Sequence, residues 1–593
     1  MLLGSGCYRG TDSGNAADGG TGDGDDGSAG ESDGSDTGDP QLPECDATLV
    51  SAETPLRRLT KVQYANTVAD LLRWAIPGDA DAIFEQLQPR LASIPDDVRV
   101  QPVGEHLGGF RRLDQAVQQQ HVDTGYQVAK ALGQAITTPE RLAIVAGPCA
   151  TDADTSNDDA CIDDFIDRFG ARVLRRPLFD DERAHYRAAF DAGGVSVGTP
   201  PEAFVDVVVA LMLAPQFMYV VEHGQDPVAG VDDVYTLSDH ELASRLSYHF
   251  WQTSPDDELL EAAANGELST DEGYAEQVDR LLANPRAREA IAAFYHEWLW
   301  LDDVPSVGGL AEQALYDEFV GDTPIDASTR DNVVRETIDM ALHYTFDEPV
   351  SMTELMLANR SFATTPDVAA IYGTEVWDGV GEPPSMPQAE RVGLLTRASR
   401  LVNGTPSTRP IMKGVFIRMA MLCDALPPPP ANANMSLPSL ESEMTTRERI
   451  EAITEQDGSC KTCHASLINP LGYITEGYDA LGRYRTEERL FDQQGQPVGS
   501  KPVDSSGVPA VTPGDETVID DPLTLTRAIL DSGRLSSCFA RHYVRFSFSR
   551  ADDEQADACM LDELTTRIDD DDPLIEVLRA VALHPTFRRR SFR

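Results

Sequence analysis

One segment of the chain has residue types and spacing that could support redox chemistry, the Cys-Lys-Thr-Cys-His sequence of residues 460–464. Two cysteines three positions apart lie one helical turn from each other, so both thiols could add to the two vinyl groups of one haem. The histidine that follows would then bind the iron as its proximal ligand. Its other ring nitrogen should donate to a backbone carbonyl, from the turn at Asn469 and Pro470 or from another nearby loop. The motif therefore predicts a covalent haem c held by Cys460, Cys463 and His464.

Two other chemistries use a Cys-x-x-Cys pair and compete with this interpretation. The first is a Cys460–Cys463 disulfide, either redox-active or structural. The second is half of a zinc site, but zinc needs a fourth ligand, and the sequence has no second Cys-x-x-Cys and no clustered pair of histidines. Haem is therefore favoured, and the disulfide is the principal alternative.

The ligand on the other side of the iron would decide what such a haem does. An open position favours small-molecule chemistry, and an occupied one favours electron transfer. The candidate is Met435, in a loop that follows the prolines of residues 427–430 and could cross a haem face. Other residues able to bind are Met412, Met419, Met421, Met444, Met560, His542 and His584. Each methionine taken singly is more typical of core packing.

The remaining cysteines indicate an oxidising compartment. Without the motif pair and Cys7, six are left: Cys45, Cys149, Cys161, Cys423, Cys538 and Cys559. An even number permits three disulfides. We expect Cys149–Cys161 and Cys538–Cys559 as short-range pairs, which leaves Cys45 for Cys423. Disulfides and covalent haem both belong outside the cytoplasm.

The first residues suggest how the chain could be held at a membrane. Ser5, Gly6 and Cys7 resemble the end of a bacterial lipoprotein signal, in which the cysteine carries the lipid; the alternative is a cytosolic tail with an incidental cysteine. Residues 10–40 are nearly all small or acidic and are typical of a flexible tether. We therefore expect an extracytoplasmic lipoprotein, at the outer membrane or cell surface, with a lipid as its only anchor.

The net charge of −51 argues against one class of partner. Nucleic-acid binding requires clustered Lys and Arg, so we expect no nucleic-acid partner. The acidity fits a solvated surface adapted to salt. If haem is attached, the expected partner is a redox protein. No Ser/His/Asp elbow, phosphate loop or paired-carboxylate signature is present, so the sequence names no catalytic residue and no substrate.

The elements that must position the motif are mainly helices. Thr60 is a candidate N-cap for a helix within residues 56–72, and Ser238, with Glu241 three residues on, has a capping-box pattern. The apolar stripe within residues 278–301 (Ile291, Phe294, Tyr295, Trp298 and Leu299) predicts a buried helix face. A β-hairpin is expected in residues 493–515, and final helices near 523–548 and 573–586.

We expect six regions along the chain. They are a tether at 1–44, helical units at 45–148, 149–228 and 229–385, a cytochrome c-like unit at 386–490, and a C-terminal unit at 491–593. The fold class is a mainly α, multi-unit helical protein.

The order of several short sequences resembles the planctomycete cytochrome c-like multidomain proteins, a family of linked domains of unknown function. The sequences that carry the resemblance are Leu56–Thr60, Arg175–Pro177, Ala214–Phe217, Leu246–Trp251, Pro255–Leu259, Asn284–Arg286, Arg409–Pro410, Lys413–Gly414, Cys460–Arg485, Val503–Gly507 and Arg545–Arg550. The most specific of them lies between Asn469 and Arg485. The chain departs from the family pattern at Gln63 and Ser549. The resemblance implies an architecture more than an activity.

The sequence is therefore compatible with three functions. The first is an exported, lipid-anchored monohaem c-type protein that transfers electrons in an extracytoplasmic oxidation. The second is a disulfide-stapled surface or scaffold protein without haem. The third is a haem enzyme with an open iron position.

Overall fold

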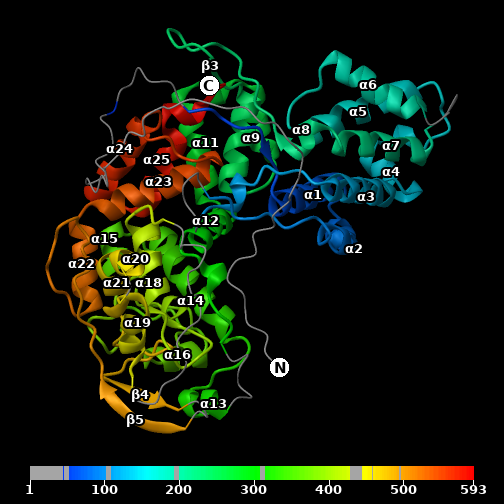
Figure 1. Cartoon of the computed structure of the whole chain (residues 1–593). Helices are drawn as coiled ribbons and strands as arrows, with labels where there is room; N and C mark the ends of the chain where they lie inside the picture. The colour runs from blue at the N-terminus through cyan, green and yellow to red at the C-terminus, as the bar shows by residue number, and fades with distance from the viewer. Residues whose placement is uncertain are drawn as a thin grey trace, which may run out of the picture. The chain divides into compact units, whose positions relative to one another are not determined.

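The computed structural model describes residue 45 and residues 52–101, 108–192, 199–307, 314–427, 444–456, 458–492 and 496–592. These residues belong to one compact unit that spans 41–593. The described part is mainly helical, and its strands form only two-stranded sheets, which confirms the predicted fold class (Figure 1). Among the described residues, no helix is both long and apolar enough to cross a membrane. The boundaries expected between regions stay predictions.

The N-terminal helices share one apolar core. They are α1 Lys61–Ala75, α2 Ala80–Leu91, α3 Gln119–Ile136, α4 Pro139–Val145, α5 Asp158–Leu174, α6 Asp180–Ala192, α7 Pro201–Met212 and α8 Pro215–Met218. Thr60 caps α1 as expected, since its hydroxyl accepts from the Gln63 N–H and the Gln63 side chain accepts from the Thr60 N–H.

The central helices belong to a second apolar core. They are α9 Asp239–Phe250, α10 Asp257–Ala264, α11 Asp271–Ala283, α12 Pro285–Trp298, α13 Ala314–Val320, α14 Thr329–Leu342, α15 Met352–Leu357 and α16 Pro366–Tyr372. Ser238 forms the predicted capping box. The stripe from Ile291 to Leu299 is buried in the core, as expected. Asn284 and Pro285 divide its segment into two helices, because Asn284 caps α12 and proline favours a first turn.

The motif region follows, with short helices in close contact. They are α17 Ala398–Leu401, α18 Pro410–Phe416, the π-helix η6 Ile417–Met421, α19 Thr446–Thr454, α20 Gly458–Cys463, the π-helix η7 His464–Ile468 and α21 Asn469–Tyr473. Figure 1 shows α18, α20 and α21 grouped together, and α18 packs against both η7 and α21.

The C-terminal region contains one helix that the sequence did not reveal. Its helices are α22 Pro522–Asp531, α23 Arg534–Phe548, α24 Ala558–Asp569 and α25 Leu574–Leu583. The helix α24 was not expected, although its buried residues Leu561, Leu564 and Ile568 have helical spacing. The β-hairpin expected in residues 493–515 begins earlier in the structure. Its strands are β4 Glu487–Phe491, in which Leu490 and Phe491 are buried, and β5 Pro497–Pro502.

The remaining two sheets join distant segments. β1 Arg57–Arg58 pairs with β2 Tyr219–Val220, and β3 Val234–Thr236 pairs with β6 Arg589–Ser591. Glu222, which is 1% exposed, follows β2 and contacts one arginine from each of these sheets. Its carboxylate accepts from Arg57 and Arg245, and its carbonyl accepts from Arg590. Burial alone would raise the pKa of Glu222, but the charges of Arg245 and Arg57 outweigh it and lower the pKa to about 2.

Replacement of Glu222 by glutamine should reveal this cluster as a pH-dependent source of stability. Because the folded pKa lies below the unfolded value of about 4.3, the contribution is present above that pH and is lost as the pH falls towards 2. At pH 7 the variant should lose about 3–5 kcal/mol, since two buried guanidinium groups lose their counter-charge. Urea denaturation of wild type, Glu222→Gln and the exposed control Glu272→Gln at pH 7 and pH 3 measures this. The difference in unfolding free energy between wild type and Glu222→Gln should be smaller at pH 3 than at pH 7. An equal difference at both pH values would contradict the prediction.

Candidate haem site

The Cys-x-x-Cys-His motif lies where a helix changes its winding. Cys460 and Cys463 belong to α20, one turn apart as expected, and both are half-buried. Cys463 packs against the central apolar core. Both cysteines lie outside the disulfides of the described residues. The motif therefore places two thiols on one helical turn directly before His464.

His464 begins the π-helix η7, and this wider turn brings Asn469 to it. The backbone N–H of Asn469 donates to the carbonyl of His464, which closes the turn. The Oδ1 atom of Asn469 lies 3.1 Å from Nδ1 of His464. The sequence led us to expect a backbone carbonyl as the partner of this ring nitrogen. The partner is instead the side chain of the residue that precedes Pro470.

The direction of this hydrogen bond follows from the other partners of Asn469. Its Nδ2 atom lies 2.8 Å from Oε1 of Glu455 and 2.9 Å from Oγ1 of Thr454. A carboxylate only accepts, so this atom is the amide nitrogen, and Oδ1 accepts from Nδ1–H of His464. The neutral form of the ring then carries its proton on Nδ1. Nε2 retains its lone pair, which is the form in which histidine binds a metal.

Asn469 is itself rigidly held, which fixes the imidazole. Its side chain is fully buried. Glu455 also accepts from the hydroxyl of Tyr473, at 3.2 Å, and the guanidinium of Arg447 lies over the Tyr473 ring. Sequence reasoning pointed to the backbone of the turn at Asn469 and Pro470, and identified neither the Asn469 side chain nor Glu455 as part of the site. The available signal was an Asn-Pro pair one wide turn after the histidine.

Two glycines allow α18 to approach the motif closely. A Cβ atom on Gly414 would lie 2.0 Å from the carbonyl oxygen of Ile468, the last residue of η7. A Cβ atom on Gly472 would lie 1.9 Å from the carbonyl oxygen of Pro410, the first residue of α18. Side-chain atoms cannot occupy either position, so these two backbones touch because both residues are glycine.

A buried ionic cluster fixes the segment after the motif. Glu476, 2% exposed, accepts from Lys413 at 2.8 Å, from Thr408 at 2.6 Å and from Arg485 at 3.0 Å. Burial would raise the pKa of Glu476, but the charges of Lys413 and Arg485 prevail and hold the pKa below its usual range. The cluster ties α18 to the chain that follows α21.

The residues that the sequence offers as a sixth ligand of the iron lie in different parts of the structure. Met435 lies outside the described residues. Met419, Met421 and Met560 are buried in the apolar core, whereas Met412 is 37% exposed on α18. His542 lies beside Cys423, and His584 caps a short helix by accepting from Thr586. The position of Met435 as a ligand stays a prediction.

The described residues form three disulfides, one of them as predicted. Cys149 and Cys161 are bonded, with Cα atoms 5.9 Å apart. The expected Cys538–Cys559 and Cys45–Cys423 pairings are wrong, because Cys423 bonds Cys538 and Cys45 bonds Cys559. Cys538 lies near the start of α23, roughly 15 Å along the helix from its C-terminal end. Cys559 lies at the start of α24, and α24 packs against α23. The two therefore lie at opposite ends of a helix pair. Cys7 lies outside the described residues.

These features define a class, a mainly helical multi-unit protein with a Cys-x-x-Cys-His motif on close-packed short helices. Three family models match the chain, each described as a protein of unknown function: PSD5 (DUF1595) at residues 161–222, PSD4 (DUF1592) at 237–374 and PSCyt3 (DUF1588) at 391–488. The chain belongs to the planctomycete cytochrome c-like multidomain family. No curated protein and no solved structure matches it.

The PSCyt3 match contains the whole candidate site. The motif, the Asn469 partners and the Glu476 cluster all fall within residues 391–488. Two thiols on one helical turn and an imidazole with Nε2 available form the donor set that haem c requires. The residues present therefore fit this group.

Proposed function

We propose that the chain is an exported, lipid-anchored monohaem c-type protein that transfers electrons in an extracytoplasmic oxidation. The observation that carries the proposal is the Asn469 hydrogen bond, which leaves Nε2 of His464 available to bind a metal beside the two motif thiols. Cys460 and Cys463 would hold haem through thioethers, and His464 would bind its iron. When bound, haem c supplies a one-electron iron couple.

The chain's own residues would do three things for this group. Asn469 sets the tautomer and orientation of the imidazole and increases its basicity. Glu455 and Thr454 hold Asn469 in place. Gly414 and Gly472, with the Glu476 cluster, lock the α18–α21 contact that positions the motif.

The decisive experiment is haem attachment. The protein should be made with the cytochrome c maturation system and analysed by in-gel haem staining and intact mass. Wild type and the exposed motif variant Lys461→Ala should carry one haem, whereas Cys460→Ser/Cys463→Ser should carry none. Wild type without stain, with Cys460 and Cys463 linked in a disulfide, would reject the proposal and favour the scaffold protein without haem.

Binding of carbon monoxide separates electron transfer from haem-based enzymology. An iron with an occupied sixth position should leave the reduced spectrum unchanged under carbon monoxide. A ready spectral change would instead favour the enzyme with an open iron. Where a change is absent, the sixth ligand can be identified by substitution, beginning with Met435→Ala.

Localisation and partner are part of the same proposal. A lipid on Cys7 should place the full chain in the membrane fraction, and Cys7→Ser should release it in soluble form. The acidic surface suggests a redox partner with a basic docking face, whose association should weaken with salt. Electron transfer insensitive to ionic strength would argue against such a partner.

Replacement of Asn469 by leucine tests its role as a positioning residue. The cysteines are unaffected, so haem should still attach. The imidazole loses the acceptor that increases its basicity, so the reduction potential should rise by tens of millivolts. Potentiometric titration of wild type, Asn469→Leu and the neighbouring exposed control Ser466→Ala measures this. An unchanged potential in a folded Asn469→Leu protein would assign Asn469 a purely structural role.

A further inference from the structure

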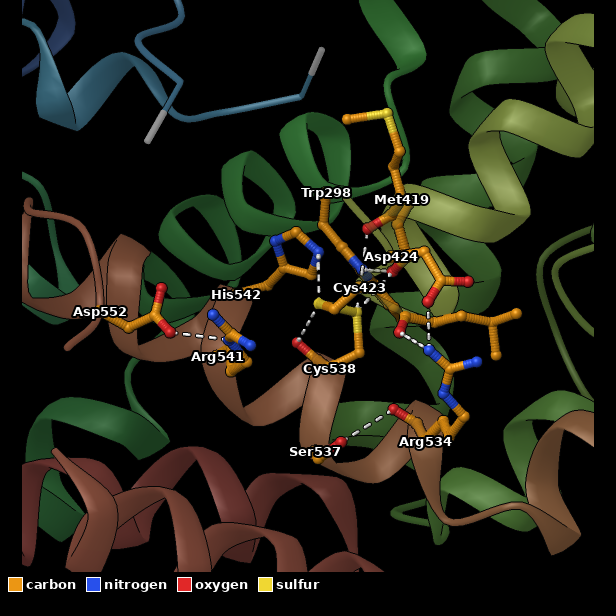
Figure 2. The surroundings of a disulfide bond; sticks show 12 residues. Trp298, Met419, Cys423, Asp424, Arg534, Ser537, Cys538, Arg541, His542 and Asp552 are labelled. Atoms are coloured by element: carbon orange, nitrogen blue, oxygen red, sulfur yellow. Dashed lines mark hydrogen bonds and ion pairs between the residues drawn. A yellow bond between two sulfur atoms is a disulfide. The ribbon is translucent and has the colours of Figure 1, made fainter. Parts of the chain in front are cut away.

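A second cluster of metal-ligating atoms lies away from the haem motif. Cys423, in the loop after η6, is bonded to Cys538 on α23, and His542 follows Cys538 by one helical turn (Figure 2). Nε2 of His542 lies 3.7 Å from Sγ of Cys423. The two sulfur atoms and one ring nitrogen all lie within 4.8 Å of one another. The three atoms therefore converge on one point.

Two of the three residues of the cluster are almost fully buried. Cys538 is 0% and His542 5% exposed, and Cys423 is half-buried. Burial first, and then the charge of Arg545, lowers the pKa of His542 to about 3, so the imidazole is neutral. Figure 2 shows the thioether of Met419 directed away from the sulfur atoms. The cluster thus offers two sulfurs and one nitrogen in an enclosed setting.

Four arginines lie around the cluster. Its neighbouring arginines are Arg418, Arg534, Arg541 and Arg545. The first two share Asp424, the other two share Asp552, and Arg541 also reaches the exposed Glu554. The carboxylates that pair with these guanidinium groups include Asp424, Asp552 and Glu554. Such surroundings favour thiolates over thiols and would stabilise the anionic product of disulfide reduction.

We propose that the Cys423–Cys538 pair, once reduced, forms with His542 a three-coordinate site for Cu⁺. Thiolate sulfur is a soft ligand and selects Cu⁺ or Zn²⁺ over harder ions. Zn²⁺ takes a fourth ligand, from the protein in structural sites and from water in catalytic ones, whereas this cluster supplies three ligands in a largely buried position. Cu⁺ is therefore the occupant that the geometry favours. The site is independent of the haem proposal.

The redox balance requires an external dithiol. The dithiol gives two electrons to the disulfide and becomes a disulfide itself, and the S–S bond of Cys423 and Cys538 breaks. The two protons of the dithiol pass to solvent as both sulfurs bind Cu⁺ as thiolates. With the neutral imidazole, the complex carries one negative charge, which the surrounding arginines offset.

The test uses full-length Cys460→Ser/Cys463→Ser protein, so that haem and the motif thiols do not contribute. It is reduced anaerobically with a phosphine and titrated with Cu⁺ against the chelator bicinchoninate, and with Zn²⁺ in parallel. One Cu⁺ per chain should bind after reduction and none before it. His542→Ala should weaken binding at least tenfold, Cys423→Ser/Cys538→Ser should abolish it, and the exposed control His185→Ala should retain it.

Three outcomes would overturn the proposal. Equal Cu⁺ binding by the protein with and without Cys423 and Cys538 would place the metal elsewhere. A site that takes Zn²⁺ and rejects Cu⁺ would overturn the choice of metal. Loss of helical circular dichroism on reduction, in step with thiol release, would make the disulfide a structural bond. X-ray absorption of the copper form should show two sulfur and one nitrogen neighbours.

Discussion

Replacement of Gly472 by alanine is expected to destabilise the region around the motif by about 3 kcal/mol or more. The new Cβ would lie 1.9 Å from the carbonyl oxygen of Pro410, and a backbone atom cannot give way as a flexible side chain can. α18 and α21 would have to separate. Alanine is otherwise the better helix former, by about 1 kcal/mol, so a loss of stability isolates the contact itself.

A nearby glycine provides a matched control. Gly477 is five residues further along, and the nearest atom to its Cβ position would be the Arg485 carbonyl oxygen, at 4.0 Å. Gly477→Ala should therefore change stability by no more than about 0.5 kcal/mol. Gly414→Ala, which would meet the Ile468 carbonyl, should behave like Gly472→Ala. The urea midpoints of the three variants test whether the close contact between α18 and α21 depends on glycine. Equal midpoints for Gly472→Ala and Gly477→Ala would refute it.

Replacement of Glu476 by leucine is expected to cost about 3–5 kcal/mol, because Lys413 is left as a buried charge without a counter-charge. In the variant Arg485 would still form an ion pair with Glu488, at 3.6 Å. Lys413 would therefore be the residue left without a carboxylate partner. The contribution of Glu476 should be present at neutral pH and lost as the pH falls below about 4.3, since its folded pKa is lowered. The variant and wild type should therefore converge in acid.

A double variant separates charge from packing. Lys413→Met together with Glu476→Leu removes both members of the pair, and apolar replacements of a buried ion pair are often neutral or stabilising. The double variant should therefore recover much of the stability lost in Glu476→Leu. Glu487→Gln, on an exposed strand position, is the control and should match wild type. A double variant no more stable than Glu476→Leu would show that Lys413 was not the source of the loss.

These two changes also connect folding to haem attachment. Neither Gly472 nor Glu476 belongs to the motif, so both variants retain Cys460, Cys463 and His464. If attachment requires the α18–α21 contact, both should stain less than wild type in proportion to their loss of stability. Full staining of an unstable variant would indicate that the motif is recognised before this region folds.

The sequence by itself determined the features that depend on neighbours in the chain. The spacing of Cys460, Cys463 and His464 identified a candidate haem site, and the sequence separation of 12 between Cys149 and Cys161 suggested a disulfide that the structure contains. The caps at Thr60 and Ser238 were readable because an N-cap and its partner lie within one helical turn. The helical periodicity of the apolar residues from Ile291 to Leu299 predicted that this helix face is buried.

Only the tertiary structure decided the features that join distant segments. Cys423 and Cys538 are 115 residues apart, and Cys45 and Cys559 are 514 apart, so their pairing depends on how helices pack and not on local spacing. Glu222 meets Arg245 and Arg57 for the same reason. Even Asn469, five residues from His464, needed the π-turn to become its partner, because a regular helix bonds the fourth residue and not the fifth. Local spacing fixes which atoms are available, and packing decides which of them meet.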